Sequence, residues 1–100
     1  MGKHSIKMDF KDLIIMPHIT WTIESQGICL MDTRSGNSSY LAYPEAALWD
    51  LLMRGYAHPE ILEMLSAITS VKKERTTVFI QDCITEWLET GYLKQVHNHG

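Results

Sequence analysis

The sequence predicts an α+β domain in which a small antiparallel sheet comes first and helices follow. Between positions 19 and 42, short apolar segments of strand length are separated by turns that contain glycine. From position 44 onward, apolar residues instead recur every three or four positions, as they do along one face of a helix. Gly55 and Gly91 stand where two of these helical stretches end, which is a common place for glycine.

One hundred residues, 45% of them apolar, suffice for one compact core and are too few for two domains. The formal charge of −3 gives no basic field, which argues against DNA or RNA as the main partner. No apolar run approaches the roughly 18–20 residues that cross a bilayer, and residues 1–12 lack the apolar core of a secretion signal. We therefore expect a cytoplasmic protein without a membrane partner.

The sheet half begins after a polar stretch, residues 1–12, which we expect to be a loose arm able to add an edge strand. The apolar run 13–16 stops at Pro17, which cannot donate to a sheet ladder. Residues 19–24 alternate between apolar and polar side chains, and this period predicts a half-buried strand. Residues 28–31 are apolar on both faces, which is typical of a central strand.

A turn, a strand and a helix then follow in quick succession. Residues 32–37 contain Asp, Ser, Gly and Asn, which favour a reversal, and residues 38–42 form the third predicted strand. Pro44 suits the first position of a helix, because its missing N–H would have had no partner there. We expect this strand and helix to form the hinge between the sheet and a helical lobe.

Two further helices complete the predicted lobe. The second begins near Pro59, and its buried stripe is expected to be Ile61, Met64, Leu65 and Ile68. The third runs from about Glu74 to Thr90, with a stripe formed by Ile80, Cys83, Ile84, Trp87 and Leu88. Gly91 ends it, Tyr92 is expected to fold back on Trp87, and residues 94–100 are expected to be a solvated tail. A three-strand, three-helix order of this kind is a winged helix-turn-helix layout with the sheet placed first.

Residue types that carry chemistry are sparse. Cys29 and Cys83 are far apart in sequence, and we expect both to be free, buried thiols. No orienting group that would make Cys83 a nucleophile is recognisable. Among the five histidines, His97 and His99 lie near the chain end without a neighbouring Cys or carboxylate. We therefore expect no catalytic residue, no metal and no cofactor.

Two stretches resemble a known family. In ICLMDTRSGNSSYLAYPEAALWDLL the family has an apolar strand, a glycine-bearing turn, an aromatic-Leu strand and an apolar helix. In VFIQDCITEWLETGYL it has a helix that closes in an apolar turn and then glycine. From Ile28 to Leu93 the sequence thus resembles the PqqD-like proteins, also called RiPP recognition elements. The positions that fit the family's ending are Trp87, Leu88, Gly91 and Leu93, while Tyr92 stands where the family has Leu.

The resemblance implies a domain at residues 13–93 that binds the leader segment of a ribosomally made precursor peptide. It also implies that the domain presents this peptide to a maturation enzyme or protease and does no chemistry itself. The leader would add as a strand at Ser38, Ser39, Tyr40, Leu41 and Ala42. Its side chains would enter a cleft whose helical side includes some of Thr76, Phe79, Cys83 and Glu86.

Elementary physics is compatible with such a site. An exposed edge strand can pair with any extended peptide, and the small Ser38 and Ser39 leave the edge accessible. Phe79 lies off the main apolar stripe of the last helix. It either faces the cleft or covers the second helix, and the sequence leaves both open.

Two other functions remain as alternatives. A DNA-binding regulator of the same fold would use the basic cluster Lys72, Lys73 and Arg75 at the start of the last helix. Glu74 and the acidic remainder of that helix favour a solvated helix start instead, although the cluster would also suit an acidic leader. The third reading is a structural subunit or homodimer, because an exposed edge can equally pair with a second copy.

Overall fold

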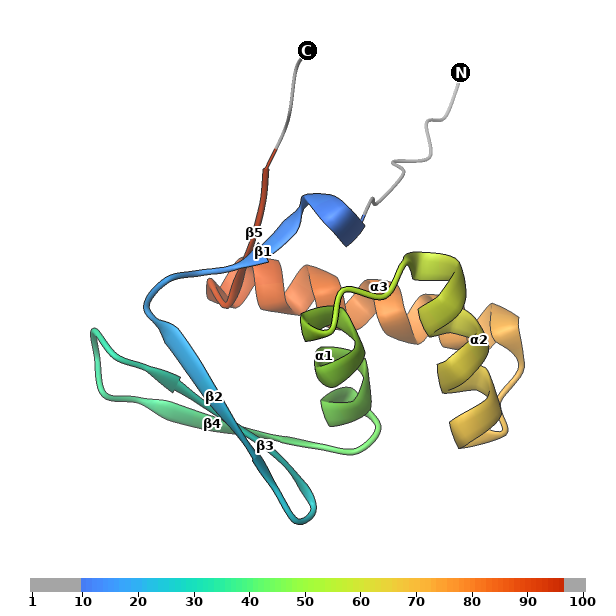
Figure 1. Cartoon of the computed structure of the whole chain (residues 1–100), viewed down its shortest axis with the longest axis horizontal. Helices are drawn as coiled ribbons and strands as arrows, with labels where there is room; N and C mark the ends of the chain where they lie inside the picture. Colours follow the sequence, from blue (N-terminus) through green and yellow to red (C-terminus); the bar gives the residue numbers. More distant parts are fainter. Residues whose placement is uncertain (1–9, 97–100) are drawn as a thin grey trace.

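The computed structural model describes residues 10–96. In this part of the chain a three-stranded antiparallel sheet is followed by three helices, which confirms the α+β, winged-helix-like prediction (Figure 1). In chain order the elements are the 3-10 helix η1 (Phe10–Asp12), β1 (Leu13–Ile15), β2 (Ile19–Glu24), β3 (Gly27–Asp32), β4 (Ser38–Ala42), α1 (Glu45–Met53), α2 (His58–Thr69), α3 (Lys73–Thr90) and β5 (Leu93–Gln95).

The main sheet has the strand order β2-β3-β4, with both pairs antiparallel. As predicted, β3 is central, and its Ile28 and Leu30 are buried. Ile28 lies opposite Leu41 of β4, and Leu30 lies opposite Ser39. Leu41 and Ser39 therefore share the sheet face that carries the core, while Tyr40, which lies between them, faces outward.

The core lies where the sheet, α1 and α3 meet. Within α1, Ala46, Leu48 and Trp49 are fully buried. The Trp49 ring stands edge-on to Trp87 of α3, with ring centroids 5.2 Å apart, an arrangement that aromatic pairs favour. The first turns of α3 pack against α2 and its last turn leads into β5, so α3 spans the domain (Figure 1).

The structure differs from the sequence prediction at both ends of the domain. β1 pairs with β5 in a separate two-stranded sheet, in which Leu13 lies opposite Gln95. Residues 94 and 95 therefore belong to a strand and not to the predicted tail, whose remainder from residue 97 lies outside the described part. Of the predicted loose arm, residues 1–9 also lie outside it. Phe10 is only 8% exposed and opens a 3-10 helix, so the inner end of the arm is packed and adds no edge strand.

The helix ends agree with the prediction only in part. Gly55 and Gly91 both have φ of +85° and follow α1 and α3, as expected. Pro44 is the N-cap of α1 and not its first helical residue. In α2 the buried face covers Ile61 and Leu65 but not Ile68, which is 66% exposed in the last turn. None of the helices in the described part is both long enough and apolar enough to cross a membrane.

Candidate functional site

β4 is an edge strand whose second side has no strand partner within residues 10–96. The N–H of Asp32 donates to the carbonyl of Asn37 at 2.9 Å, and this bond fixes which residues pair across β3 and β4. In an antiparallel ladder the direction of the backbone groups alternates. Ser39 and Leu41 consequently point their N–H and C=O groups at β3. Ser38, Tyr40 and Ala42 (all exposed) point theirs away from the sheet.

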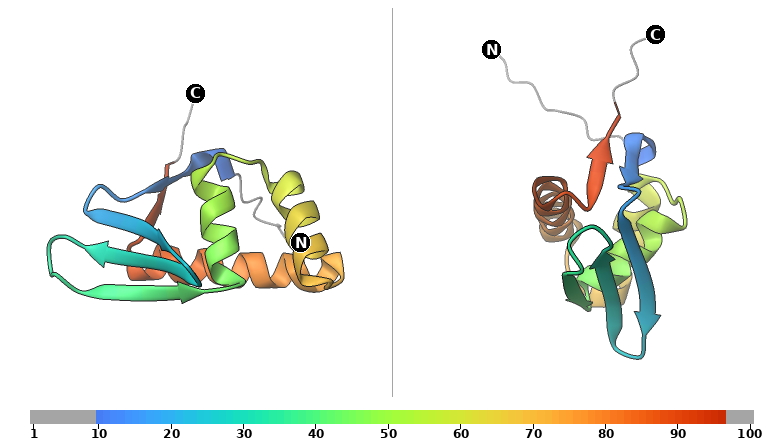
Figure 2. Two further views of the ribbon diagram at one scale, coloured as in Figure 1. Left: turned by 60° about the horizontal axis from the view of Figure 1, so that its bottom comes forward. Right: turned by 90° about the vertical axis from the view of Figure 1, so that its left-hand side faces the viewer.

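The helix α3 lies beside this edge. In both views of Figure 2, α3 is on the β4 side of the sheet. The hydroxyl groups of Ser39 and Tyr92 are 2.6 Å apart and hydrogen-bonded, which ties β4 to the residue just after the Gly91 cap. Tyr92 was predicted to make a hydrophobic contact with Trp87; the structure shows a backbone bond instead, in which the Tyr92 N–H donates to the Trp87 carbonyl at 2.9 Å. The Tyr92 ring stands edge-on to Trp49, with centroids 6.5 Å apart.

β4 and α3 also come close at the other end of β4. Pro44, two residues past β4, borders the same pocket as Phe79 in the first half of α3. β4 ends at Ala42, and residues 43 and 44 form a turn that leads into α1. Ser39 thus lies near the end of α3 and Pro44 near its first half, so β4 and α3 run in opposite directions (Figure 1).

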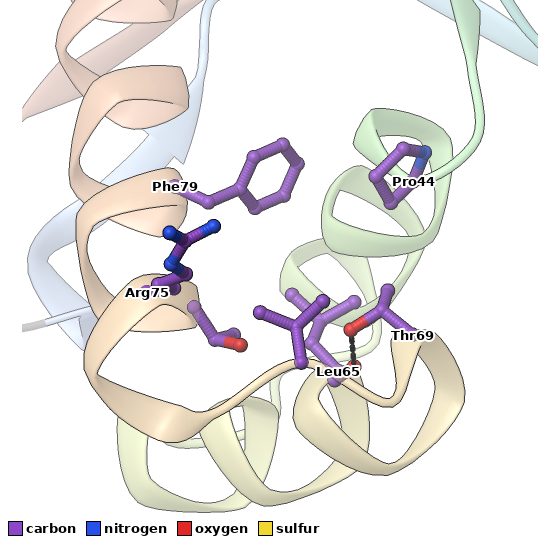
Figure 3. Close-up of a pocket in the computed structure, with 7 residues that line it drawn as sticks. Pro44, Leu65, Thr69, Arg75 and Phe79 are labelled. Carbon is purple, nitrogen blue, oxygen red and sulfur yellow. Dashed lines mark hydrogen bonds between the residues drawn. The ribbon is translucent and has the colours of Figure 1, made fainter.

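The pocket has a volume of about 260 Å³. Its wall consists of Pro44, of Leu65 and Thr69 from α2, of Val71, and of Arg75, Thr76 and Phe79 (Figure 3). The Thr69 hydroxyl donates to the Leu65 carbonyl at 2.7 Å, and the Thr76 hydroxyl donates to the Lys72 carbonyl at 3.1 Å. Because the backbone already engages both hydroxyls, the wall is apolar except for the Arg75 side chain.

The predicted site residues of α3 differ in accessibility. Thr76 is 3% exposed, but it borders the pocket together with Phe79. Phe79 packs against the core cluster and also borders the hollow. Its place in a peptide-binding cleft stays a prediction. Cys83 is 8% exposed, one turn further along, and Glu86 is exposed beyond it.

The environment of Cys83 disfavours the thiolate form of its side chain. Burial, together with the nearby carboxylates Glu45, Glu86 and Asp82, raises the pKa of Cys83 to about 12. The thiol therefore stays protonated near neutral pH, and the thiolate is the nucleophilic form. Both cysteines are free, as predicted. Cys83 is buried, but Cys29 is only half-buried, so the prediction that both are buried is wrong for Cys29. Within residues 10–96 no cluster of His, Cys, Asp or Glu side chains is suited to hold a metal ion.

The basic cluster does not form one continuous positive face. Lys73 pairs with Glu63 of α2, Lys72 is the N-cap of α3, and Arg75 borders the pocket. In the described part of the chain Arg75 has no ion pair. The cluster therefore separates into a bridge between two helices and one arginine beside an apolar hollow.

Sequence reasoning missed several residues that shape the site. Pro44, Leu65 and Arg75 come from three different elements, and only the fold brings them together. The spacing of four between Arg75 and Phe79, which places both on one side of a helix, was a usable signal. A second signal was Tyr92, the position where the sequence departs from the pattern it resembles, because its hydroxyl makes the bond to Ser39.

Comparison with known proteins gives matches by structure alone. No family model matches the sequence, and no curated protein does. A structure of a lasso peptide synthetase B1 complexed with the leader peptide is similar, with a TM-score of 0.76 and 22% identity over 83% of this chain and 98% of that chain. So is TbiB1 in complex with the TbiA(beta) leader peptide, with a TM-score of 0.75 and 18% identity over 84% of this chain and 98% of that chain. The chain therefore shares its fold with two proteins that were solved with leader peptides.

Proposed function

We propose that this protein binds the leader segment of a ribosomally made precursor peptide and presents it to a separate maturation enzyme or protease. One observation carries the proposal. Within residues 10–96, β4 offers an unpaired backbone edge beside α3, in a fold shared with two proteins solved with leader peptides. An open edge accepts an extended peptide as a further strand, and pockets beside the edge select alternate side chains.

Affinity in this proposal comes mainly from the backbone of β4. Ser38, Tyr40 and Ala42 turn their N–H and C=O groups toward the free edge. These three residues can exchange up to about six hydrogen bonds with a peptide, each contributing a net ~0.5–1.5 kcal/mol. Ser39 and Leu41 hold the strand against β3, so the edge is already in the extended form that a peptide needs.

Selectivity in this proposal comes from the cleft between β4 and α3. Phe79 and Thr76 border the apolar pocket, where a side chain of the leader would be buried. Glu86 lies on the exposed surface of α3 and would meet polar groups of the leader. Cys83 lies under that surface and would form part of the cleft floor.

The proposal also covers the protein family and its location in the cell. We assign the chain to the PqqD-like RiPP recognition elements and to the cytoplasm, where precursor peptides are made. Chemistry is left to the partner enzyme, in keeping with the protonated Cys83 thiol. A second copy of the chain could pair with the same edge, and such a homodimer would compete with the leader for β4.

Calorimetric titration with the leader of a small peptide encoded beside the gene tests the proposal. In the variant Ala42→Pro the outward N–H of residue 42 is lost, while the hydrogen bonds between β3 and β4 are kept. We expect its affinity to fall about tenfold or more, because a ladder bond is lost and the proline ring crowds the edge. Ile23→Pro is the matched control, since it removes an outward N–H on the opposite edge of the same sheet. Equal affinities of both variants and the wild type would contradict strand addition at β4.

A further inference from the structure

The pocket beside Pro44 has the size and chemistry of a side-chain receptor. Its volume of about 260 Å³ lies below the roughly 300–1,000 Å³ of small-molecule sites. The hydroxyls of Thr69 and Thr76 are engaged by backbone carbonyls, so a polar ligand would find few partners in the wall. A single apolar side chain, or two neighbouring ones, fits this space better than a cofactor does.

One charged group stands at this apolar hollow. Figure 3 shows the guanidinium of Arg75 beside the Phe79 ring, turned toward the hollow. Arg75 has no ion pair within residues 10–96, whereas its neighbour Lys73 is occupied by Glu63. A guanidinium presents donors in a planar fork that matches a carboxylate, and the exposed Arg75 leaves this fork accessible to a ligand.

The pocket also continues the path of the β4 edge. Ala42 is the last residue of β4, and Pro44 already forms part of the pocket wall. A peptide paired with β4 that extends past Ala42 by one or two residues, at about 3.3 Å per residue, reaches the hollow. The same peptide can therefore use the strand edge and the pocket together.

We propose that the pocket and Arg75 together read a two-residue signature in the bound peptide. The signature is an apolar side chain, which enters the pocket, next to an Asp or Glu, whose carboxylate pairs with the Arg75 guanidinium. Both residues lie in the part of the peptide beyond the Ala42 end of β4. This inference rests on the proposed function, and it identifies Arg75 as a specificity-determining residue.

Selection from a library of random twelve-residue peptides displayed on phage tests this signature. The three baits are the wild type, Arg75→Glu and the control Lys94→Glu. Lys94 is exposed on β5 after the far end of α3, and its reversal changes the net charge by the same amount. We expect the wild type and the control to enrich an apolar residue adjacent to Asp or Glu. We expect Arg75→Glu to keep the apolar residue and to replace the acidic one by Lys or Arg.

A charge swap on one selected peptide makes the test quantitative. Changing its acidic residue to Lys is expected to weaken wild-type binding about tenfold, and Arg75→Glu is expected to recover most of that loss. An unchanged consensus with Arg75→Glu, or a consensus that follows Lys94, would overturn the role of Arg75. The wild-type protein could instead form a dimer through the pocket. If sedimentation showed such a dimer, and showed that Phe79→Ser is a monomer, the proposed role of Arg75 would also be overturned.

Failure of this inference is separable from failure of the proposed function. Selected peptides that lose binding to Ala42→Pro but show no acidic preference leave strand addition at β4 intact and refute only the signature. Peptides that bind Ala42→Pro as well as the wild type contradict strand addition. If the acidic residue of such peptides is still replaced by a basic one in the Arg75→Glu selection, the result supports the signature without strand addition. A wild type that enriches no peptide contradicts both.

Discussion

Gly27→Ala is expected to disrupt the pairing of β3 with β4. Gly27 is buried opposite Ala42, and a Cβ placed on it would lie 2.2 Å from the Leu41 carbonyl oxygen and 2.7 Å from ring atoms of Tyr40. The Tyr40 ring can rotate away, but the carbonyl belongs to the β4 backbone and moves only with the strand. Overpacking of this kind costs about 1–3 kcal/mol. At about 4–8 °C per kcal/mol for a domain of this size, the melting temperature should fall by roughly 4–24 °C.

Thermal denaturation and amide hydrogen exchange together check the consequence for the edge. In Gly27→Ala we expect faster exchange along β4 and at least tenfold weaker binding of the leader peptide. Gly55→Ala is the control, because it also strains the backbone, at φ of +85°, but meets no atom within 4 Å and lies after α1. It should lower the melting temperature without changing β4 exchange or peptide affinity. A Gly27→Ala protein that melts within about 2 °C of the wild type, with unchanged β4 exchange, would refute this reasoning.

Four further predictions follow from local features of the structure. Phe79→Asp puts a charge into the apolar hollow and should weaken peptide binding about tenfold with the fold intact, as calorimetry and circular dichroism can establish; unchanged affinity would remove Phe79 from the site. In a double-mutant cycle, Ser39→Ala and Tyr92→Phe should show a coupling of about 1 kcal/mol in unfolding free energy, because they share one hydrogen bond; additive effects would contradict that bond. At pH 8 a thiol reagent should label the half-buried Cys29 well before the buried Cys83, and equal rates would count against the burial. Since the pKa of Cys83 is raised from 9.0 to about 12, the unfolded chain loses this proton first, and the free energy of unfolding should fall as the pH rises from 9 toward 12.

The sheet and the helices were predictable because their hydrophobic periods extend over enough residues. Residues 19–24 and 28–31 each contain a complete pattern, and glycine has a physical reason to stand after a helix. β1 and β5 have three residues each, which is too short for a period of two to show. Their partners also lie about eighty positions apart in the sequence, so only the closed fold reveals the pair.

The site was predictable where it depends on one element and not where several elements meet. The strand Ser38–Ala42 agrees with the predicted range, because a turn before it and a proline after it set its limits. The pocket depends on how far α2 stands from α3, which no local pattern encodes. The spacing that predicted Ile68 to be buried failed for the same reason, since a helical stripe does not say where its packing partner ends.

A nitrogen–proton NMR titration of the labelled protein tests strand addition most directly. The ligand is the leader of the small peptide encoded beside the gene. We expect shifts along Ser38–Ala42, largest at the outward N–H groups of Tyr40 and Ala42, together with shifts at Phe79 across the cleft. The shifts along Ser38–Ala42 should change little with salt, because backbone hydrogen bonds hold this part of the peptide. No shift with the peptide, but strongly salt-dependent shifts at 72–75 with duplex DNA, would contradict strand addition and favour a DNA-binding regulator.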